Sequence, residues 1–199
     1  MVEVKEFYSQ AYAPRTQHNA KAAQLTCAFA CDMYTAGEML TKKCAGLKYL
    51  GFEITRENIN SSDYLAEWCG KIRRYVNNYK VKTINVAGNG IYTLVKYGVH
   101  QEDVNNLLFT ILSDLKDNTK LQSVVSGGQT GVDIAAAVAC YKLGIDCIIT
   151  LPKEFIQRNK EGVDMVHTKE QIEQSIYTMS EHLQLLGNAD VAKVTKCRL

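Results

Sequence analysis

Short apolar runs alternate with longer amphipathic stretches along most of the chain. Five runs are short and almost continuously apolar, as buried strands are: LTCAFAC (25–31), KYLGFEI (48–54), KTINVAG (82–88), QSVVSG (122–127) and DCIITLP (146–152). The alanines and cysteines of the first run are also compatible with a helix. Strands that alternate with helices are typical of parallel sheets, so the pattern predicts an α/β fold with helices on both faces of the sheet.

The stretches between these runs carry helical signals. Apolar side chains recur on one helical face of residues 62–79, at Tyr64, Leu65, Trp68, Ile72 and Val76. Thr35-Ala-Gly-Glu38 is a candidate capping box that opens a helix ending at Gly46. Thr168-Lys-Glu-Gln171 opens another, which we expect to run to about Leu186.

Length and composition favour one domain over residues 1–199. The chain is 46% hydrophobic and has only two prolines, so it can bury a core and shows no linker. The most polar, loop-like joint is LKDNTKLQ (115–122).

Charge and cysteine content argue against nucleic-acid binding, membrane binding and a metal site. A net charge of +2 without a long basic run gives no electrostatic reason to bind nucleic acid or membranes. Seven cysteines without a CxxC pair, and none near a histidine at ligand spacing, predict reduced thiols and no metal site. Without an apolar signal region or a run approaching about 18 apolar residues, we expect a cytoplasmic protein.

The turn SGGQTGVD (126–133) connects a predicted strand to a predicted helix. Glycines at a helix start let backbone N–H groups approach an anion, so a phosphate is the expected ligand. The candidate N–H donors are those of Gly127, Gly128, Thr130 and Gly131, with Gln129 free to contact a polar edge of the ligand. The alternative is a tight turn whose glycines serve geometry alone. If the turn binds the ligand, Gly128→Val should abolish binding and leave the fold intact.

Four motifs together resemble the molybdenum-cofactor carrier family. SGGQTGVD resembles the opening motif of that family, residues 12–19 its YxxRTxxN segment, residues 36–41 its GGTxxT loop and residues 84–88 its LNVAG strand. The family belongs to a Rossmann-like superfamily that includes Lonely Guy-type phosphoribohydrolases. The resemblance therefore implies a Rossmann-like fold and a homo-oligomer.

The order of the motifs differs from that of the family. Residues 1–115 resemble its C-terminal part and residues 122–165 its N-terminal part, so the chain resembles a circular permutant joined at 115–122. Residues 23–26 lack the acidic position of the family's SDGT segment, and Asn89-Gly90 replaces its late arginine. These departures argue against molybdenum cofactor as the ligand.

Ligands of open parallel sheets collect at the carboxyl ends of the strands, where the motifs would meet. Arg15 is the natural bidentate partner of a phosphate, although it could be a surface arginine. Arg158 could hold a second phosphate or be a solvated loop charge. Further candidate ligand contacts are Thr16, Asn19, Gly37, Gly88, Asn89, Gly90 and Asp133.

Glu38 departs from the resemblance, because the family has threonine there. A carboxylate repels phosphate unless it is protonated, pairs with Arg15 or binds a sugar hydroxyl. It could equally cap the helix. If the protein is an enzyme, Glu38 and Asp133 are the candidate acid and base.

The favoured interpretation is binding of a nucleotide or another phosphate-bearing small molecule, without chemistry. The first alternative is hydrolysis of a nucleotide N-glycosidic or phosphate bond. The second is nucleic-acid binding, against which the lack of a basic stripe or aromatic platform argues.

Overall fold

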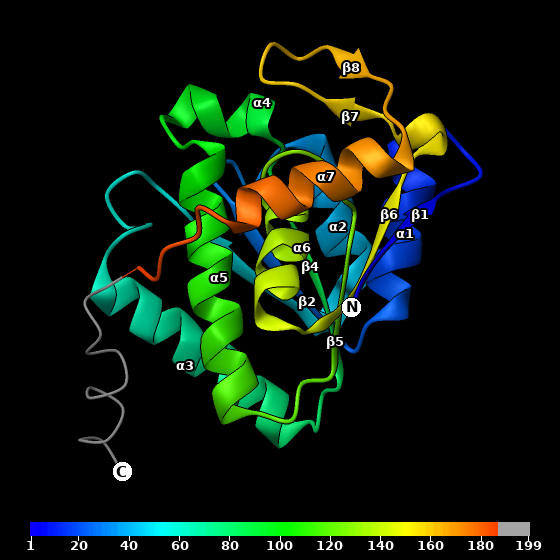
Figure 1. The fold of residues 1–199 in the computed structure, drawn as a ribbon. Helices are drawn as coiled ribbons and strands as arrows, with labels where there is room; N and C mark the ends of the chain where they lie inside the picture. The colour runs from blue at the N-terminus through cyan, green and yellow to red at the C-terminus, as the bar shows by residue number, and fades with distance from the viewer. Residues whose placement is uncertain (187–199) are drawn as a thin grey trace.

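A six-stranded, wholly parallel sheet forms the centre of the protein, whose computed structural model describes residues 1–186 (Figure 1). Its order is β1-β6-β5-β4-β2-β3. The strands are β1 (Val2–Glu6), β2 (Leu25–Ala30), β3 (Tyr49–Glu53), β4 (Thr83–Gly88), β5 (Ser123–Ser126) and β6 (Asp146–Leu151). The fold is an α/β fold of the Rossmann-like type.

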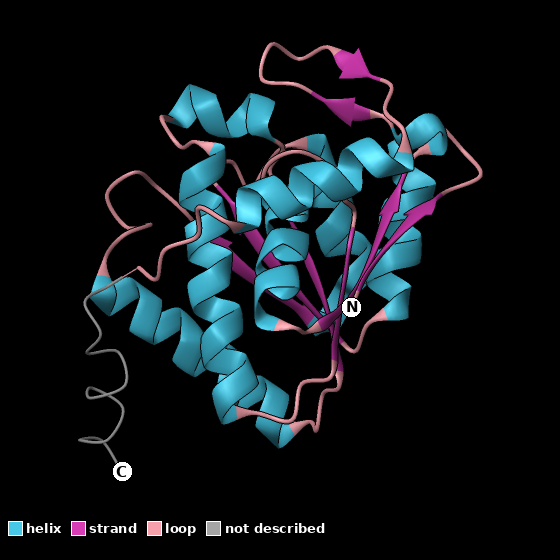
Figure 2. Ribbon diagram, viewed as in Figure 1, coloured by secondary structure: helices cyan, strands magenta, loops and turns pink. Residues whose placement is uncertain are grey.

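Helices cover both faces of the sheet (Figure 2). On one face lie α1 (Tyr12–Ala22) and α2 (Ala36–Ala45), and on the other α3 (Ser62–Asn78), α5 (Gln101–Asn118), α6 (Val132–Leu143) and α7 (Lys169–Ser180). The short α4 (Ile91–Leu94) follows β4. Beside it, an antiparallel hairpin of β7 (Gln157–Arg158) and β8 (Asp164–Met165) projects beyond the carboxyl edge of the sheet.

Burial explains the apolar runs of the sequence. All six residues of β2 are buried, because helices lie on both faces and strands on both sides of it. Helix α6 is buried from Val132 to Cys140, between the sheet and its neighbours α5 and α7. On α3 the predicted apolar face is buried, apart from Tyr64, which is half exposed.

The five predicted strands are confirmed, and residues 25–30 form a strand rather than a helix. Strand β1 was not predicted, because VEVKE is an edge strand in which only Val4 is buried. The joint at 115–122 is helical up to Asn118, so the loop is shorter than expected. Helix α7 begins at its predicted capping box but ends at Ser180, short of Leu186. The circular permutation stays a prediction.

No helix within residues 1–186 is long and apolar enough to cross a bilayer. The six cysteines in this part of the chain are free thiols, and five of them are buried. Cys197 lies outside the described residues.

Candidate functional site

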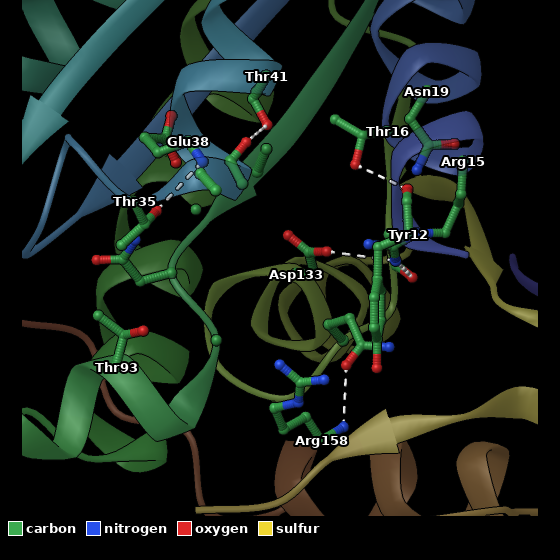
Figure 3. Close-up of a pocket in the computed structure, with 18 of the residues that line it drawn as sticks. Tyr12, Arg15, Thr16, Asn19, Thr35, Glu38, Thr41, Thr93, Asp133 and Arg158 are labelled. Carbon is green, nitrogen blue, oxygen red and sulfur yellow. Dashed lines mark hydrogen bonds and ion pairs between the residues drawn. The ribbon is translucent and has the colours of Figure 1, made fainter. Parts of the chain in front are cut away.

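A cavity of about 410 Å³ opens at the carboxyl ends of the strands. It lies where the chain order reverses: β3 extends the sheet from β2 on one side, and β5 and β6 extend it from β4 on the other. Figure 3 shows side chains of α1 on one side of the cavity, those of α2 on the other, and Asp133 between them.

Most of the predicted ligand contacts line this cavity. They are Arg15, Thr16, Asn19, Gly37, Glu38, Gly88, Asn89, Gly90, Gly127, Gln129, Asp133 and Arg158. Gly128, Thr130 and Gly131 do not line it. Twelve of the fifteen predicted ligand contacts therefore share one cavity, and the three that do not belong to the glycine turn.

Arg15 is a buried arginine of α1, only 5% exposed. Its Nη1 donates to the carbonyl oxygens of Gly127 and Thr150 and lies 3.6 Å from Oδ2 of Asp133. Its Nε has no hydrogen-bond partner among the described residues. Arg15 thus forms a buried ion pair with Asp133 and is not a surface arginine.

The first two glycines of the SGGQTG turn are required by close packing. A Cβ at Gly127 would overlap both Asp133 and Arg15. Gly128 has φ +69°, and a Cβ there would lie 2.8 Å from the side chain of Leu151. Our expectation that Gly128→Val leaves the fold intact is therefore wrong, because the valine would meet both a left-handed backbone and a filled space.

Of the four N–H groups expected to cradle a phosphate, that of Gly131 at the helix start has a protein partner. Gly131 N–H donates to Oε1 of Gln101 at 2.6 Å, and Val132 N–H donates to the Asn89 carbonyl at 3.2 Å. Burial raises the pKa of Asp133 to about 6, although Arg15 and backbone N–H groups of the turn and of β4 oppose this shift. An internal carboxyl group therefore stands beside the turn where the sequence predicted a ligand anion.

The polar side chains of the same turn hold the β7–β8 hairpin. Gln129 donates to the Ile156 carbonyl at 2.6 Å and accepts from the Arg158 N–H at 3.0 Å. The Thr130 hydroxyl donates to the Arg158 carbonyl. Although Gln129 lines the cavity, its amide is engaged by the hairpin.

Arg158 lies at the rim and is paired. Its Nε and Nη2 donate to the two carboxylate oxygens of Asp164 at 2.8 and 3.0 Å, and the Tyr12 hydroxyl donates to the same carboxylate at 2.9 Å. Arg158 is therefore an exposed arginine in an ion pair with Asp164, and its role as a phosphate ligand stays a prediction. In the cavity wall, both arginines are paired with carboxylates.

The start of α2 is more open. The Thr35 hydroxyl accepts from the Glu38 N–H at 3.2 Å, which is one half of the predicted capping box. The other half is absent, because Glu38 accepts instead from the Tyr49 hydroxyl at 2.8 Å. Within residues 1–186, the N–H groups of Ala36 and Gly37 make no hydrogen bond, and both residues line the cavity.

Glu38 is a second buried carboxyl group in the cavity wall, 3% exposed. Burial raises its pKa, the hydrogen bond from Tyr49 lowers it, and the neighbouring charge of Asp133 raises it further. Burial and the charge of Asp133 therefore both favour the protonated form of Glu38.

Several neutral polar groups complete the wall. Asn89 fixes the loop after β2 through two hydrogen bonds to the backbone of Asp32, at 2.8 and 3.1 Å. The Thr16 hydroxyl donates to the Tyr12 carbonyl. Asn19 is 5% exposed, and its amide makes no hydrogen bond to any residue in the described part of the chain. Asn19 is thus available to a ligand, whereas Asn89 is structural.

Nine further residues line the cavity, namely Tyr12, Thr35, Ala36, Thr41, Asn85, Ala87, Ile91, Tyr92 and Thr93. Tyr12, Thr35 and Thr41 lie within or beside the motifs, so that inspection of motif neighbours could have found them. Tyr92 and Thr93 follow the AGNG turn on the very short helix α4, for which no helical signal was recognised. No group of three metal-ligating side chains occurs in residues 1–186.

Comparison of the chain with family models, curated proteins and solved structures returned no match. The resemblance to molybdenum-cofactor carriers therefore stays a prediction that depends on the four motifs alone. The fold and the cavity do not depend on it.

Proposed function

We propose that the protein binds a nucleotide-like small molecule in this cavity, with the phosphate at the start of α2 and not at the SGGQTG turn. The observation that carries the proposal is the pair of unpartnered N–H groups of Ala36 and Gly37 at the positive end of a ten-residue helix, in the wall of the cavity. The raised pKa of Glu38 reduces the repulsion that its carboxyl group would otherwise exert on a phosphate.

The size and chemistry of the cavity suit such a ligand. About 410 Å³ lies in the range of about 300–1,000 Å³ that small-molecule sites occupy. The free amide of Asn19 and the carboxyl group of Glu38 offer the donors and acceptors that sugar hydroxyls need. Because Arg15 and Arg158 are each paired, attraction to the phosphate rests on the helix start rather than on excess positive charge.

Proline at the first position of α2 tests where the phosphate binds. Ala36→Pro removes one N–H, while the preceding Thr35 already has ψ 151°, as a residue before proline requires. We expect AMP affinity, measured by calorimetry, to fall about tenfold, as loss of a charge-assisted hydrogen bond implies. Adenosine affinity should not change.

Lys169→Pro is the matched control, since Lys169 is the first residue of α7 and does not line the cavity. It should leave both affinities unchanged. If a panel of nucleoside mono-, di- and cyclic phosphates fails to bind the wild type, the proposal is wrong. If AMP binds Ala36→Pro and the wild type equally, the phosphate site is elsewhere.

A second candidate function is hydrolysis of an N-glycosidic bond of the bound nucleotide. The specific observation is that Glu38 and Asp133, both buried, share one cavity and both have raised pKa values. In this reaction a water oxygen forms a bond to the sugar carbon as the carbon–nitrogen bond breaks. Glu38 would give its proton to the departing base, and Asp133 would accept a proton from the water.

Release of free base from nucleoside monophosphates tests this second function. Glu38→Gln keeps the size of the side chain but removes its proton, so we expect turnover to fall by about 100-fold or more. AMP affinity should change little. Absence of base release by the wild type would leave binding without chemistry as the function.

Molybdenum cofactor fits the cavity poorly. Besides its phosphate it carries an oxo-molybdenum group, and both arginines of the wall, which could contact this second group, are already paired with carboxylates. Asn89, in the segment where the family has arginine, is committed to the backbone of Asp32. A homo-oligomer, which the resemblance also implies, is a separate proposal that light scattering would test.

A further inference from the structure

The carboxyl group of Glu38 is held by a residue from outside the cavity. Tyr49 is the first residue of the edge strand β3, which follows α2 after a three-residue turn of 3-10 helix. Its hydroxyl donates to Oε1 of Glu38 at 2.8 Å. Tyr49 does not line the cavity, so it contacts the site only through Glu38.

The position of the Tyr49 ring depends on a glycine two residues further along β3. A Cβ at Gly51 would lie 2.8 Å from the ring of Tyr49 and 2.7 Å from Met33. Residues two apart on a strand point to the same side, and the absence of a side chain at Gly51 lets the ring occupy that side. Lys42 of α2 places its Nζ 5.9 Å from the centre of the same ring.

We propose that Tyr49 is a positioning residue, which fixes one oxygen of Glu38 and thereby presents the other, Oε2, to the ligand. The inference rests on the proposed function, because it assumes that the cavity binds a ligand. Burial alone does not orient a carboxyl group, and the hydroxyl of Tyr49 is the only side-chain donor to Glu38 within residues 1–186.

The charged groups around Glu38 determine how the hydroxyl of Tyr49 affects its ionisation. Asp133 of α6 acts on Glu38 as a like charge and is itself paired with Arg15 of α1. Tyr49 approaches Glu38 from β3. Lys42 of α2 lies against the ring of Tyr49 and not on the carboxyl group of Glu38. The hydrogen bond from Tyr49 therefore favours the ionised form of Glu38, against burial and the charge of Asp133.

Titration of Glu38 tests the inference independently of any ligand. Tyr49→Phe removes one hydroxyl, and carboxyl carbon NMR should show the pKa of Glu38 rising by about one unit, as loss of a hydrogen bond to a charged group implies. Tyr79→Phe is the control, because Tyr79 follows the C-terminal end of α3 and is 68% exposed. It should leave the titration of Glu38 unchanged.

Gly51→Ala provides a second variant that keeps the hydroxyl but displaces the ring. It should raise the pKa of Glu38 in the same direction as Tyr49→Phe. If Glu38 titrates as in the wild type in both variants, Tyr49 does not position it and the inference is wrong.

AMP serves as the ligand probe. If the wild type binds AMP, Tyr49→Phe should weaken binding about threefold or more, and unchanged affinity would also overturn the inference. If the wild type does not bind AMP, the proposed function fails for that ligand, while the titration still decides whether Tyr49 positions Glu38.

Discussion

The starts of α6 and α2, both at the carboxyl edge of the sheet, each include glycine and differ in how their backbone N–H groups are used. In the β5–α6 turn, SGGQTG, the helix-start N–H groups donate to Gln101 and to the loop after β4, and the Arg15–Asp133 pair lies against Gly127. In the β2–α2 turn, TAGE, two N–H groups remain free in the cavity wall. In the turn with the stronger sequence motif, the N–H groups of Gly131 and Val132 at the helix start are therefore already paired.

The difference follows from where each helix starts. Helix α6 is buried along its first nine residues, so its N-terminal N–H groups have no access to water and need protein partners. Ala36 and Gly37 are exposed residues, and water or a ligand can satisfy them. A glycine-rich turn is thus a ligand site only if the fold leaves its N–H groups free.

Gly128→Val should produce the largest effect. A β-branched residue at φ +69° with a filled neighbourhood combines backbone strain and overpacking, which together cost about 4 kcal/mol of unfolding free energy. Gly144→Val is the control, since Gly144 has φ +67° and no atom within 4 Å of a Cβ. Equal losses in urea denaturation would show that packing against Leu151 contributes nothing.

The buried carboxyl group of Asp133, beside the SGGQTG turn, should make the stability of the protein depend on pH. Because the pKa of Asp133 is about 6 in the folded protein and ordinarily 3.8, the folded state binds this proton more tightly. Its contribution is fully present below about pH 4 and is lost as the pH rises through 6, by at most about 3 kcal/mol. Asp133→Asn should show a smaller fall between pH 4 and 7, and equal falls would contradict the prediction.

Gly127→Ala adds one methyl group to the SGGQTG turn and should lower the stability of the protein. The new Cβ would overlap the Arg15–Asp133 pair and cost about 2 kcal/mol of unfolding free energy through overpacking. Chemical denaturation at pH 7 measures this loss. A stability equal to that of the wild type would mean that the ion pair relocates without cost.

A glycine-to-alanine change at the start of α2 should instead raise the stability of the protein slightly. Gly37 lies in the first turn of α2 with no atom within 4 Å of a Cβ, so Gly37→Ala should stabilise the protein by about 0.5–1 kcal/mol. Denaturation under the conditions used for Gly127→Ala tests it. A clear loss of stability would show that the start of α2 is as tightly packed as that of α6.

Sequence patterns predicted most of the fold and many of the residues that line the cavity. Buried strands appear as apolar runs because both faces of the sheet are covered, whereas β1 escaped detection because the alternating charges of VEVKE leave only Val4 buried. The lining residues on the motifs were found because the carboxyl ends of parallel strands converge. Tyr49 was missed, since its role depends on contact with a helix and not on a motif.

The sequence by itself determined the parallel α/β architecture, the capping of α2 by Thr35 and the cluster of polar residues at one edge of the sheet, because local periodicity and turn chemistry specify these. Only the tertiary structure decided which helix start keeps free N–H groups. It also decided that Arg15 pairs with Asp133 and that Glu38 accepts from Tyr49 instead of completing the capping box. These outcomes depend on burial and on partners distant in sequence. Hydrogen-bonding capacity is a local property, but its satisfaction is set by the whole fold.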